Sequence, residues 1–146
     1  MRLLIQRVNQ ASVEVENRVV GSIGKGILVL FGCHADDKPS QIEYLANKLL
    51  NLRFFKDDQG KMNRSVLDIK GEILVVSQFT LYADCQTGRR PSFTQSLNPE
   101  LAKQYYNQYI DILKKSSLNI QTGEFGAYMR VSLVNDGPVT FILDAK

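Results

Sequence analysis

The sequence is poor in the side chains on which hydrolases and transferases commonly depend. Among its 146 residues one is a histidine, His34, and two are cysteines, Cys33 and Cys85. The cysteines lie far apart and lack the paired spacing of a zinc or redox site, so we expect both to be reduced and Cys33 to lie in the core. His34 directly follows an apolar stretch, where a histidine is more often a surface residue than a catalyst. Because no histidine joins the acidic pairs at 36–37 and 57–58 as a ligand, we expect neither a metal nor a cofactor.

Long apolar runs are also missing. No run approaches the length of a membrane span, and near its start the chain turns polar after three apolar residues, too few for a signal peptide. The chain has 4 Pro, 10 Gly, 44% hydrophobic and 23% charged residues, with no repeat or low-complexity tract, which is typical of a globular protein. We therefore expect a cytoplasmic protein with a single domain over residues 1–146, because a chain of this length can bury roughly 68–70% of its unfolded surface.

Familiar catalytic motifs are absent as well. The sequence contains no Gly-x-Ser-x-Gly, no His-Glu-x-x-His, no Gly-x-x-x-x-Gly-Lys and no dinucleotide-binding fingerprint. The glycine-rich residues 21–26 lie between two expected strands rather than before a helix, so we assign them to a turn. A site in this chain must therefore be built from hydroxyls, amides and backbone groups.

Apolar patterns predict strands through most of the chain. We expect them at residues 3–8, 12–16, 19–23, 27–31, 72–76, 127–134 and 139–143. The continuous run at 27–31 is short enough to be a strand buried on both faces. Because local connections dominate, the strands favour a mainly antiparallel sheet that tends toward a barrel.

Two segments have helical periodicity instead. One follows residue 39 and begins with Ser40 and Glu43 in the form of a capping box. The other spans residues 99–115, with Asn98 as its N-cap and a proline in its first position. Its tyrosines fit a core and interface stripe better than a base-stacking surface. The expected fold class is therefore mixed α/β with two main helices.

The end of the buried strand at 72–76 is the first candidate site, and it consists of Ser77, Gln78, Phe79 and Thr80. Strand ends commonly expose free N–H groups, and such donors stabilise a developing oxyanion by about 2.7–4 kcal/mol each. The alternative is a capped strand end, with Thr80 starting a helical turn. As a nucleophile Thr80 would need a base or a lowered pKa, and no base lies near it in the sequence. The site should therefore depend little on side-chain acids and bases.

A second candidate is the pair Gly137 and Pro138. The preceding Asn135 and Asp136 complete an ideal hairpin turn with Gly137. Pro138 also stands at the entry to a strand, where a cis peptide can be held, because the trans preference before proline is only about 0.5–1 kcal/mol. Such a peptide would present a fixed pair of carbonyl acceptors suited to an ammonium group. The residues alone leave both interpretations open.

The charge of the chain permits an anionic partner without requiring one. Its formal net charge is +3 and its pI about 8.9. The bias is concentrated at Arg89 and Arg90, which share a Gly/Pro-bounded loop with the hydroxyls of Thr87 and Ser92 and precede Phe93. This loop is a candidate for holding phosphates. A solvated loop with two surface arginines is the alternative.

Four segments together resemble one known family. Residues 77–81 (Ser-Gln-Phe-Thr-Leu), 88–93 (Gly-Arg-Arg-Pro-Ser-Phe), 122–127 (Thr-Gly-Glu-Phe-Gly-Ala) and 135–140 (Asn-Asp-Gly-Pro-Val-Thr) are similar in type, order and spacing to motifs of the D-aminoacyl-tRNA deacylases. With residues 6–8 the resemblance covers essentially the whole chain. It implies a homodimer, without a cofactor, that hydrolyses the ester joining a D-amino acid, or glycine, to the terminal adenosine of tRNA. The function would be chiral proofreading in translation.

The resemblance also implies roles for the candidate residues. The segment matching Gly137 and Pro138 is a cis dipeptide that enters the partner subunit's active site, where its carbonyls hold the substrate's amino group and exclude an L-side chain. The segment matching residues 77–80 forms the floor of the pocket. The 2′-hydroxyl of the terminal ribose assists the reaction, which explains the missing protein base. From charge alone we add Arg89 and Arg90 as possible tRNA contacts.

Two other functions fit parts of the sequence. A non-catalytic tRNA- or RNA-binding module would use the basic balance and the arginine pair, with salt-sensitive binding and no turnover. A small-molecule amidohydrolase or esterase is disfavoured, because the sequence shows no pair of nucleophile and base.

Overall fold

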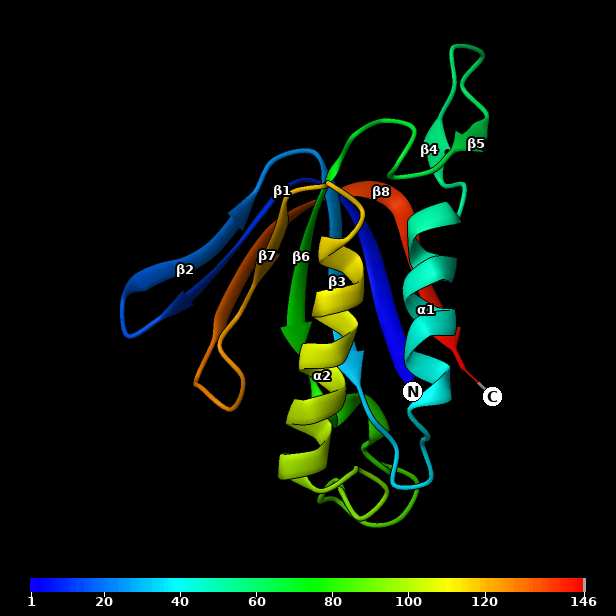
Figure 1. The fold of residues 1–146 in the computed structure, drawn as a ribbon. Coiled ribbons are helices and arrows are strands. Elements are labelled where there is room, and N and C mark those ends of the chain that lie inside the picture. The colour runs from blue at the N-terminus through cyan, green and yellow to red at the C-terminus, as the bar shows by residue number, and fades with distance from the viewer. Residues whose placement is uncertain (146) are drawn as a thin grey trace.

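One large sheet organises the protein. The computed structural model describes residues 1–145, and in that range the sheet has six strands (Figure 1). The strands are β1 (Arg2–Val15), β2 (Arg18–Ile23), β3 (Gly26–Gly32), β6 (Glu72–Ser77), β7 (Ile120–Thr122) and β8 (Arg130–Asp144). They lie in the order β2-β1-β3-β6-β7, and β8 pairs with β1. The three pairings of β1 are antiparallel, while β3–β6 and β6–β7 are parallel.

β1 and β8 are each one long strand where the sequence predicted two. The polar residues 9–10 in β1 suggested a break, and residues 135–138 in β8 suggested a hairpin turn; both predictions were wrong. β8 stays paired with β1 from Arg130 to Asp144, and shifts of register near Val8 absorb the irregularity. Instead of a hairpin turn, residues 136–139 form a bulge that the Asn135 side chain closes by donating to the backbone carbonyls of Arg7 and Val139, at 2.9 and 3.1 Å.

The two α-helices lie together on one face of the sheet (Figure 1). They are α1 (Ser40–Asn51) and α2 (Pro99–Lys114). The N-cap of α2 is confirmed, since the Asn98 side chain accepts from the Leu101 amide at 3.0 Å. The capping box of α1 was wrong: Pro39 occupies its N-cap position without a side-chain cap, and the Lys38 amide donates to Gln41 Oε1 at 2.9 Å instead.

Two clusters of buried side chains fill the two sides of the sheet. The larger cluster lies between the sheet and the helices and includes the buried tyrosines of α2, as predicted, and Cys33. The smaller one lies on the inner side of the curved sheet, where β2 contacts β6 and β7. β2 approaches β7 so closely at Gly21 that a Cβ would lie 2.5 Å from the carbonyl oxygen of Thr122. This curvature confirms the expected tendency toward a barrel.

Two short strands, β4 (Phe55–Lys56) and β5 (Met62–Arg64), form a separate antiparallel hairpin after α1. The hairpin stands clear of the rest of the protein (Figure 1). A short 3-10 helix, η1 (Phe79–Tyr82), follows β6. No helix within residues 1–145 has the length and apolar character needed to span a membrane.

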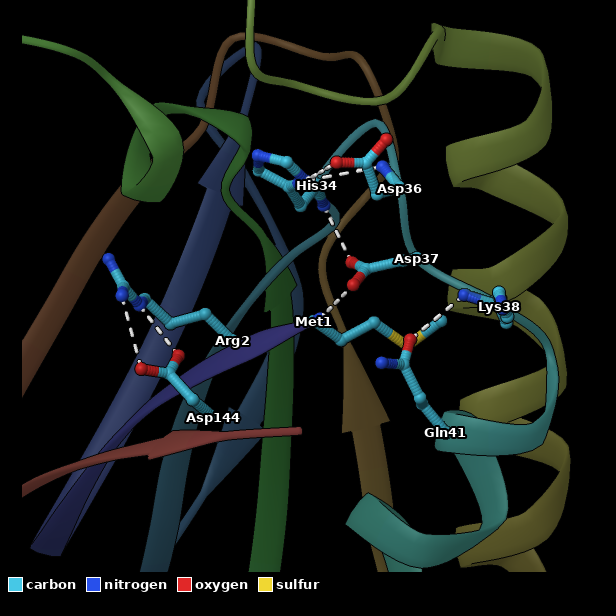
Figure 2. A network of polar contacts seen from close by, with 8 residues as sticks. All are labelled: Met1, Arg2, His34, Asp36, Asp37, Lys38, Gln41 and Asp144. Carbon is cyan, nitrogen blue, oxygen red and sulfur yellow. Dashed lines mark hydrogen bonds and ion pairs between the residues drawn. The ribbon is translucent and has the colours of Figure 1, made fainter. Parts of the chain in front are cut away.

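A network of polar contacts fixes the start of the chain against the loop between β3 and α1 (Figure 2). The ammonium group of Met1 pairs with Asp37 Oδ1, and Asp37 Oδ2 accepts from the His34 amide at 2.6 Å. His34 Nδ1 accepts from the Asp36 amide at 3.2 Å, and its ring lies edge-on to that of Tyr82. His34 is therefore half-buried and hydrogen-bonded within this loop.

Candidate active site

The first candidate segment lies where β6 leaves the sheet and enters η1. The Gln78 amide donates to the Phe31 carbonyl at 2.7 Å, which ends the ladder between β3 and β6. The predicted helical turn is present but starts at Phe79 rather than Thr80. The first N–H groups of a helical turn have no acceptor inside it, so the amides of Phe79 and Thr80 are available to a ligand. The Thr80 hydroxyl accepts a hydrogen bond from the Gln78 side chain.

A cavity of about 760 Å³ opens beside this segment. Ser77, Gln78 and Phe79 line it, whereas Thr80 is outside the lining. The remaining walls come from residues 93–102 and 125–131, together with three side chains of β3, β6 and the following loop: Phe31, Val76 and Cys33. A volume of roughly 300–1,000 Å³ is usual for small-ligand sites.

The lining is almost free of groups that transfer protons at neutral pH. It contains no Asp, Glu, His, Lys or Arg within residues 1–145. Burial, with a smaller contribution from Asp37, raises the pKa of the Cys33 thiol to about 12. Since the thiolate is the nucleophilic form of cysteine, Cys33 is inert at neutral pH. In the same range no three His, Cys, Asp or Glu side chains are grouped so that they could hold a metal ion.

Contacts from distant parts of the chain hold η1 in place. Arg2 Nη1 donates to the Leu81 carbonyl at 3.2 Å, and the guanidinium lies 5.2 Å from the centre of the Tyr82 ring. The same side chain makes two bonds to Asp144, from Nε at 2.8 Å and from Nη2 at 3.1 Å (Figure 2). On the other side, Ser96 Oγ donates to the Phe79 carbonyl at 3.1 Å. The turn is thus tied to one end of the β1–β8 pair and to the loop before α2.

The second candidate segment lies on β8. The Gly137–Pro138 peptide is cis, and both residues are exposed. Next to it, Arg7 is buried with 2% of its surface accessible, and its Nε lies 2.8 Å from Asp136 Oδ2. Arg7 Nη1 also donates to the Phe54 carbonyl at 2.6 Å. The Asp136 side chain, directly before the exposed dipeptide, therefore holds it against β1.

One chain does not bring the two candidate segments together. Residues 137–138 lie beside Arg7, which pairs with Ile27 on β3, whereas Ser77 pairs with Phe31. The four residues from Ile27 to Phe31 correspond to about 13 Å along the strands, and three strand spacings add about 14 Å across the sheet. Within one copy, the exposed dipeptide and the cavity therefore lie at different ends of the sheet.

Arg89 and Arg90 lie at the tip of an exposed loop. Asp84 and Ser92 close the loop through two backbone hydrogen bonds, of 2.8 and 2.9 Å. Phe93 directly follows this closure and lines the cavity, where its ring packs edge-on against that of Phe79. The arginine pair is therefore outside the lining, on a loop that leads directly into the cavity wall at Phe93.

Sequence reasoning missed part of the wall. Ser96, Leu97, Tyr128 and Met129 all line the cavity, and none was a candidate residue. The available signal was their position directly after two of the motif segments, 88–93 and 122–127. Strand and helix patterns do not show that these loops converge on the end of β6.

Known proteins match this chain over nearly its whole length. The sequence profile of the family described as D-Tyr-tRNA(Tyr) deacylase matches residues 4–144. A relative from Thermosipho africanus named D-aminoacyl-tRNA deacylase is 57% identical over 146 residues, which are 100% of this chain and 98% of the relative. A protein of the same name from Clostridium kluyveri is 53% identical, with the same coverage.

Solved structures show the same fold. A c-Myc DNA Unwinding Element Binding Protein is 42% identical, with a TM-score of 0.93 over 100% of this chain and 99% of that one. A probable eukaryotic D-amino acid tRNA deacylase, at 18% identity, has a TM-score of 0.83 over 99% and 98% of the two chains and shows the fold alone.

The family match and the named relatives agree on one class of protein, the hydrolases that act on ester bonds. Within that class, the chain belongs to the D-Tyr-tRNA(Tyr) deacylase family. The resemblance of the four sequence motifs to this family is thereby confirmed.

Proposed function

We propose that this protein is a cytoplasmic proofreading enzyme that hydrolyses the ester of D-aminoacyl-tRNA, and of glycyl-tRNA, and leaves L-aminoacyl-tRNA intact. The family and the names of its relatives support the substrate. The observation that carries the proposal is the cavity at η1, which offers backbone amides but no charged side chain. An aminoacyl ester is already activated, so a site of this kind suffices for its hydrolysis.

In this proposal the free amide of Phe79, which lines the cavity, receives the developing oxyanion. Water attacks the ester carbonyl carbon, the bond to the ribose oxygen breaks, and that oxygen takes a proton as the free tRNA and the amino acid leave. The neighbouring 2′-hydroxyl of the ribose handles the proton that no protein group in the cavity can take. Each oxyanion donor contributes about 2.7–4 kcal/mol in other enzymes, and fixed positioning of the ester adds to this.

Chirality is selected by a second copy of the chain. We place Gly137 and Pro138 of one subunit in the cavity of its partner, where their carbonyls accept from the substrate's ammonium group. An L-side chain would then meet backbone, a D-side chain would point away, and glycine would pass because it has no side chain. The separation of the two segments within one copy supports an active site at the interface of a homodimer.

The tRNA itself requires cationic contacts near the cavity. Arg89 and Arg90 are exposed on the loop that leads into its wall, and the planar guanidinium group suits bidentate contact with phosphate. We therefore assign phosphate contact to this loop.

The proposal is tested by comparing deacylation of D-tyrosyl-tRNA and L-tyrosyl-tRNA by the purified protein. We expect rapid release from the D-ester only. Equal rates on the two esters would contradict chiral selection. Salt-sensitive binding of tRNA without turnover of either ester would favour the alternative, a non-catalytic RNA-binding module.

A further inference from the structure

The β4–β5 hairpin takes no part in the proposed reaction, yet it is the most prominent projection of the chain. It extends away from the sheet and α1 (Figure 1). Its tip, residues 58–63, is exposed throughout. At its base Phe55 is buried in the core, but the tip adds no buried side chain, so its position and charge indicate what it contacts.

The base of the hairpin lies beside the dipeptide segment. Phe54, directly before β4, accepts the hydrogen bond from Arg7 Nη1, and Arg7 also pairs with Asp136. The Phe54 ring is 5.9 Å from the ring of Phe141 on β8, in an edge-on arrangement. The hairpin and Gly137 are therefore on the same side of the molecule. In the proposed dimer, where this dipeptide enters a partner's cavity, the hairpin would stand on the side of its subunit that faces that partner.

Internal hydrogen bonds hold the shape of the hairpin tip. Asp57 Oδ1 accepts from the amides of Gln59 and Lys61, both at 2.9 Å, and Oδ2 accepts from Asn63 Nδ2 at 2.7 Å. The hydrogen bond from Asn63, with those from the two amides, holds the pKa of Asp57 below its usual value. The Asp57 carboxylate is thus turned into the loop that it stabilises.

Residues 55–64 carry three cations, Lys56, Lys61 and Arg64, against the two carboxylates of Asp57 and Asp58, a net charge of +1. Asp58 pairs with Arg64 at 2.9 Å, and Asp57 is turned into the loop. Lys56 and Lys61 are exposed, and within residues 1–145 neither has a carboxylate within 4.0 Å. The hairpin therefore presents two ammonium groups that no carboxylate contacts directly.

We propose that Lys56 and Lys61 bind backbone phosphates of the tRNA whose terminal nucleotide lies in the partner subunit's cavity. This inference rests on the proposed function. It adds a contact between the tRNA and the subunit whose own cavity does not hold the ester. Lys56 lies two residues after Phe54 and Lys61 lies seven residues after it, and the six residue steps from Phe54 to Gly60 span at most about 20 Å. The two ammonium groups are therefore spread along the hairpin and can face successive phosphates, which they bind as point charges.

The test compares Lys56→Ala/Lys61→Ala with wild type on two substrates, D-tyrosyl-tRNA and the D-tyrosyl ester of adenosine, which has no phosphate. Removal of two phosphate contacts lowers the salt exponent by about 1.4–1.8. Between 50 and 200 mM salt, the fold-increase in KM for the tRNA should therefore be about ten times smaller in the variant than in wild type. The rate on the adenosine ester should not change. The control, Lys48→Ala/Lys103→Ala, removes the same charge from the exposed faces of α1 and α2.

Each outcome decides one question. An unchanged salt dependence in the hairpin variant, or an equal change in the helix control, would overturn the hairpin contact. An equal loss of activity on the adenosine ester would also overturn it, because that substrate has no phosphate for the lysines to bind. If wild type hydrolyses neither D-ester, it is the proposed function that fails.

Discussion

Arg7 Nε lies 2.8 Å from Asp136 Oδ2, and this ion pair joins the buried middle of β1 to the exposed part of β8. Because Asp136 directly precedes Gly137 and Pro138, this ion pair fixes the position of an exposed dipeptide. Its energetic importance follows from the burial of the guanidinium, which would be left partly unpaired without its carboxylate.

Asp136→Asn should destabilise the protein by about 1.5–3 kcal/mol, because a buried cation loses its charged partner while Asp136 itself is only partly buried. The free energy of unfolding in urea measures this. Glu14→Gln is the matched control, since its partner Arg130 is largely exposed and the loss should be below about 1 kcal/mol. Equal losses in the two variants would contradict the importance of burial.

The two cysteines should differ sharply in reactivity. With a pKa of about 12, roughly one Cys33 thiol in 10⁴ is ionised at pH 8, whereas Cys85 is exposed. Iodoacetamide should therefore label only Cys85 in the native protein and both residues in urea, as read by mass spectrometry. Labelled protein should keep its activity on D-tyrosyl-tRNA. Rapid labelling of Cys33 in the native protein, or of the Cys85→Ser variant, would contradict the burial of the Cys33 thiol.

Thr80→Ala should retain more than about a fifth of the wild-type kcat, because the threonine hydroxyl lies outside the cavity lining and has no activating base. A D-aminoacyl-tRNA that ends in 2′-deoxyadenosine should react at least about 100-fold more slowly, as expected when a general acid–base group is removed. Single-turnover rates separate these effects from binding. Complete loss of activity in folded Thr80→Ala would instead indicate a side-chain nucleophile.

Gly137→Ala tests the interface. An added Cβ has 3.4 Å to its nearest atom, Asn135 Oδ1, so the variant should fold. In the partner's cavity the methyl group should displace the substrate ammonium and lower activity at least tenfold, roughly the effect of losing one good hydrogen bond to a charge. Ala127→Trp should block the cavity from within.

Mixing these two inactive variants should restore activity. In a mixed dimer one site combines the intact cavity of one chain with the intact glycine of the other. At equal amounts and free exchange, about a quarter of all sites should be active in a twofold dimer. No recovery, although mixed dimers are shown by mass spectrometry, would place both segments of each site in one chain.

The hairpin tip should loosen in acid. The pKa of Asp57 is lower in the folded hairpin than in the unfolded chain, so its contribution is present above the unfolded pKa and is lost as the pH falls through the folded value. Asp57→Asn should reduce the protection of the Lys61 amide from hydrogen exchange at neutral pH, and the difference from wild type should shrink below about pH 4. A difference that stays constant with pH would mean that the carboxylate charge is not involved.

Local sequence signals predicted those elements whose stability is set locally or by simple burial. The apolar run at 27–31 gave β3, and Asn98 followed by proline marked the start of α2. The capping box at Ser40 failed because Pro39 already continues the helical backbone to its N-cap. Whether a residue caps a helix depends on its backbone conformation, which residue types alone do not determine.

Long-range pairing explains the remaining differences. Residues 9–10 and 135–138 have turn-forming sequences, yet each stays in a strand because β1 and β8 pair on both sides of these residues. For the same reason the sequence did not show that residues 93–99 and 125–131 meet beside Phe79. The assignment of roles to Ser77–Thr80, Gly137–Pro138 and Arg89–Arg90 remains a prediction for the experiments above.

β8 forms an open edge of the sheet, which bears on the association of this chain with other chains. Over its 15 residues it pairs with β1 and, within the described range, with no other strand, while Val134 and Ile142 leave 45% and 63% of their surface accessible. An open strand edge presents unpaired backbone groups to which another extended chain can add. The bulge at residues 136–139 and the register shifts beside it interrupt this edge, so a chain that adds to β8 can pair with only one straight half of it at a time.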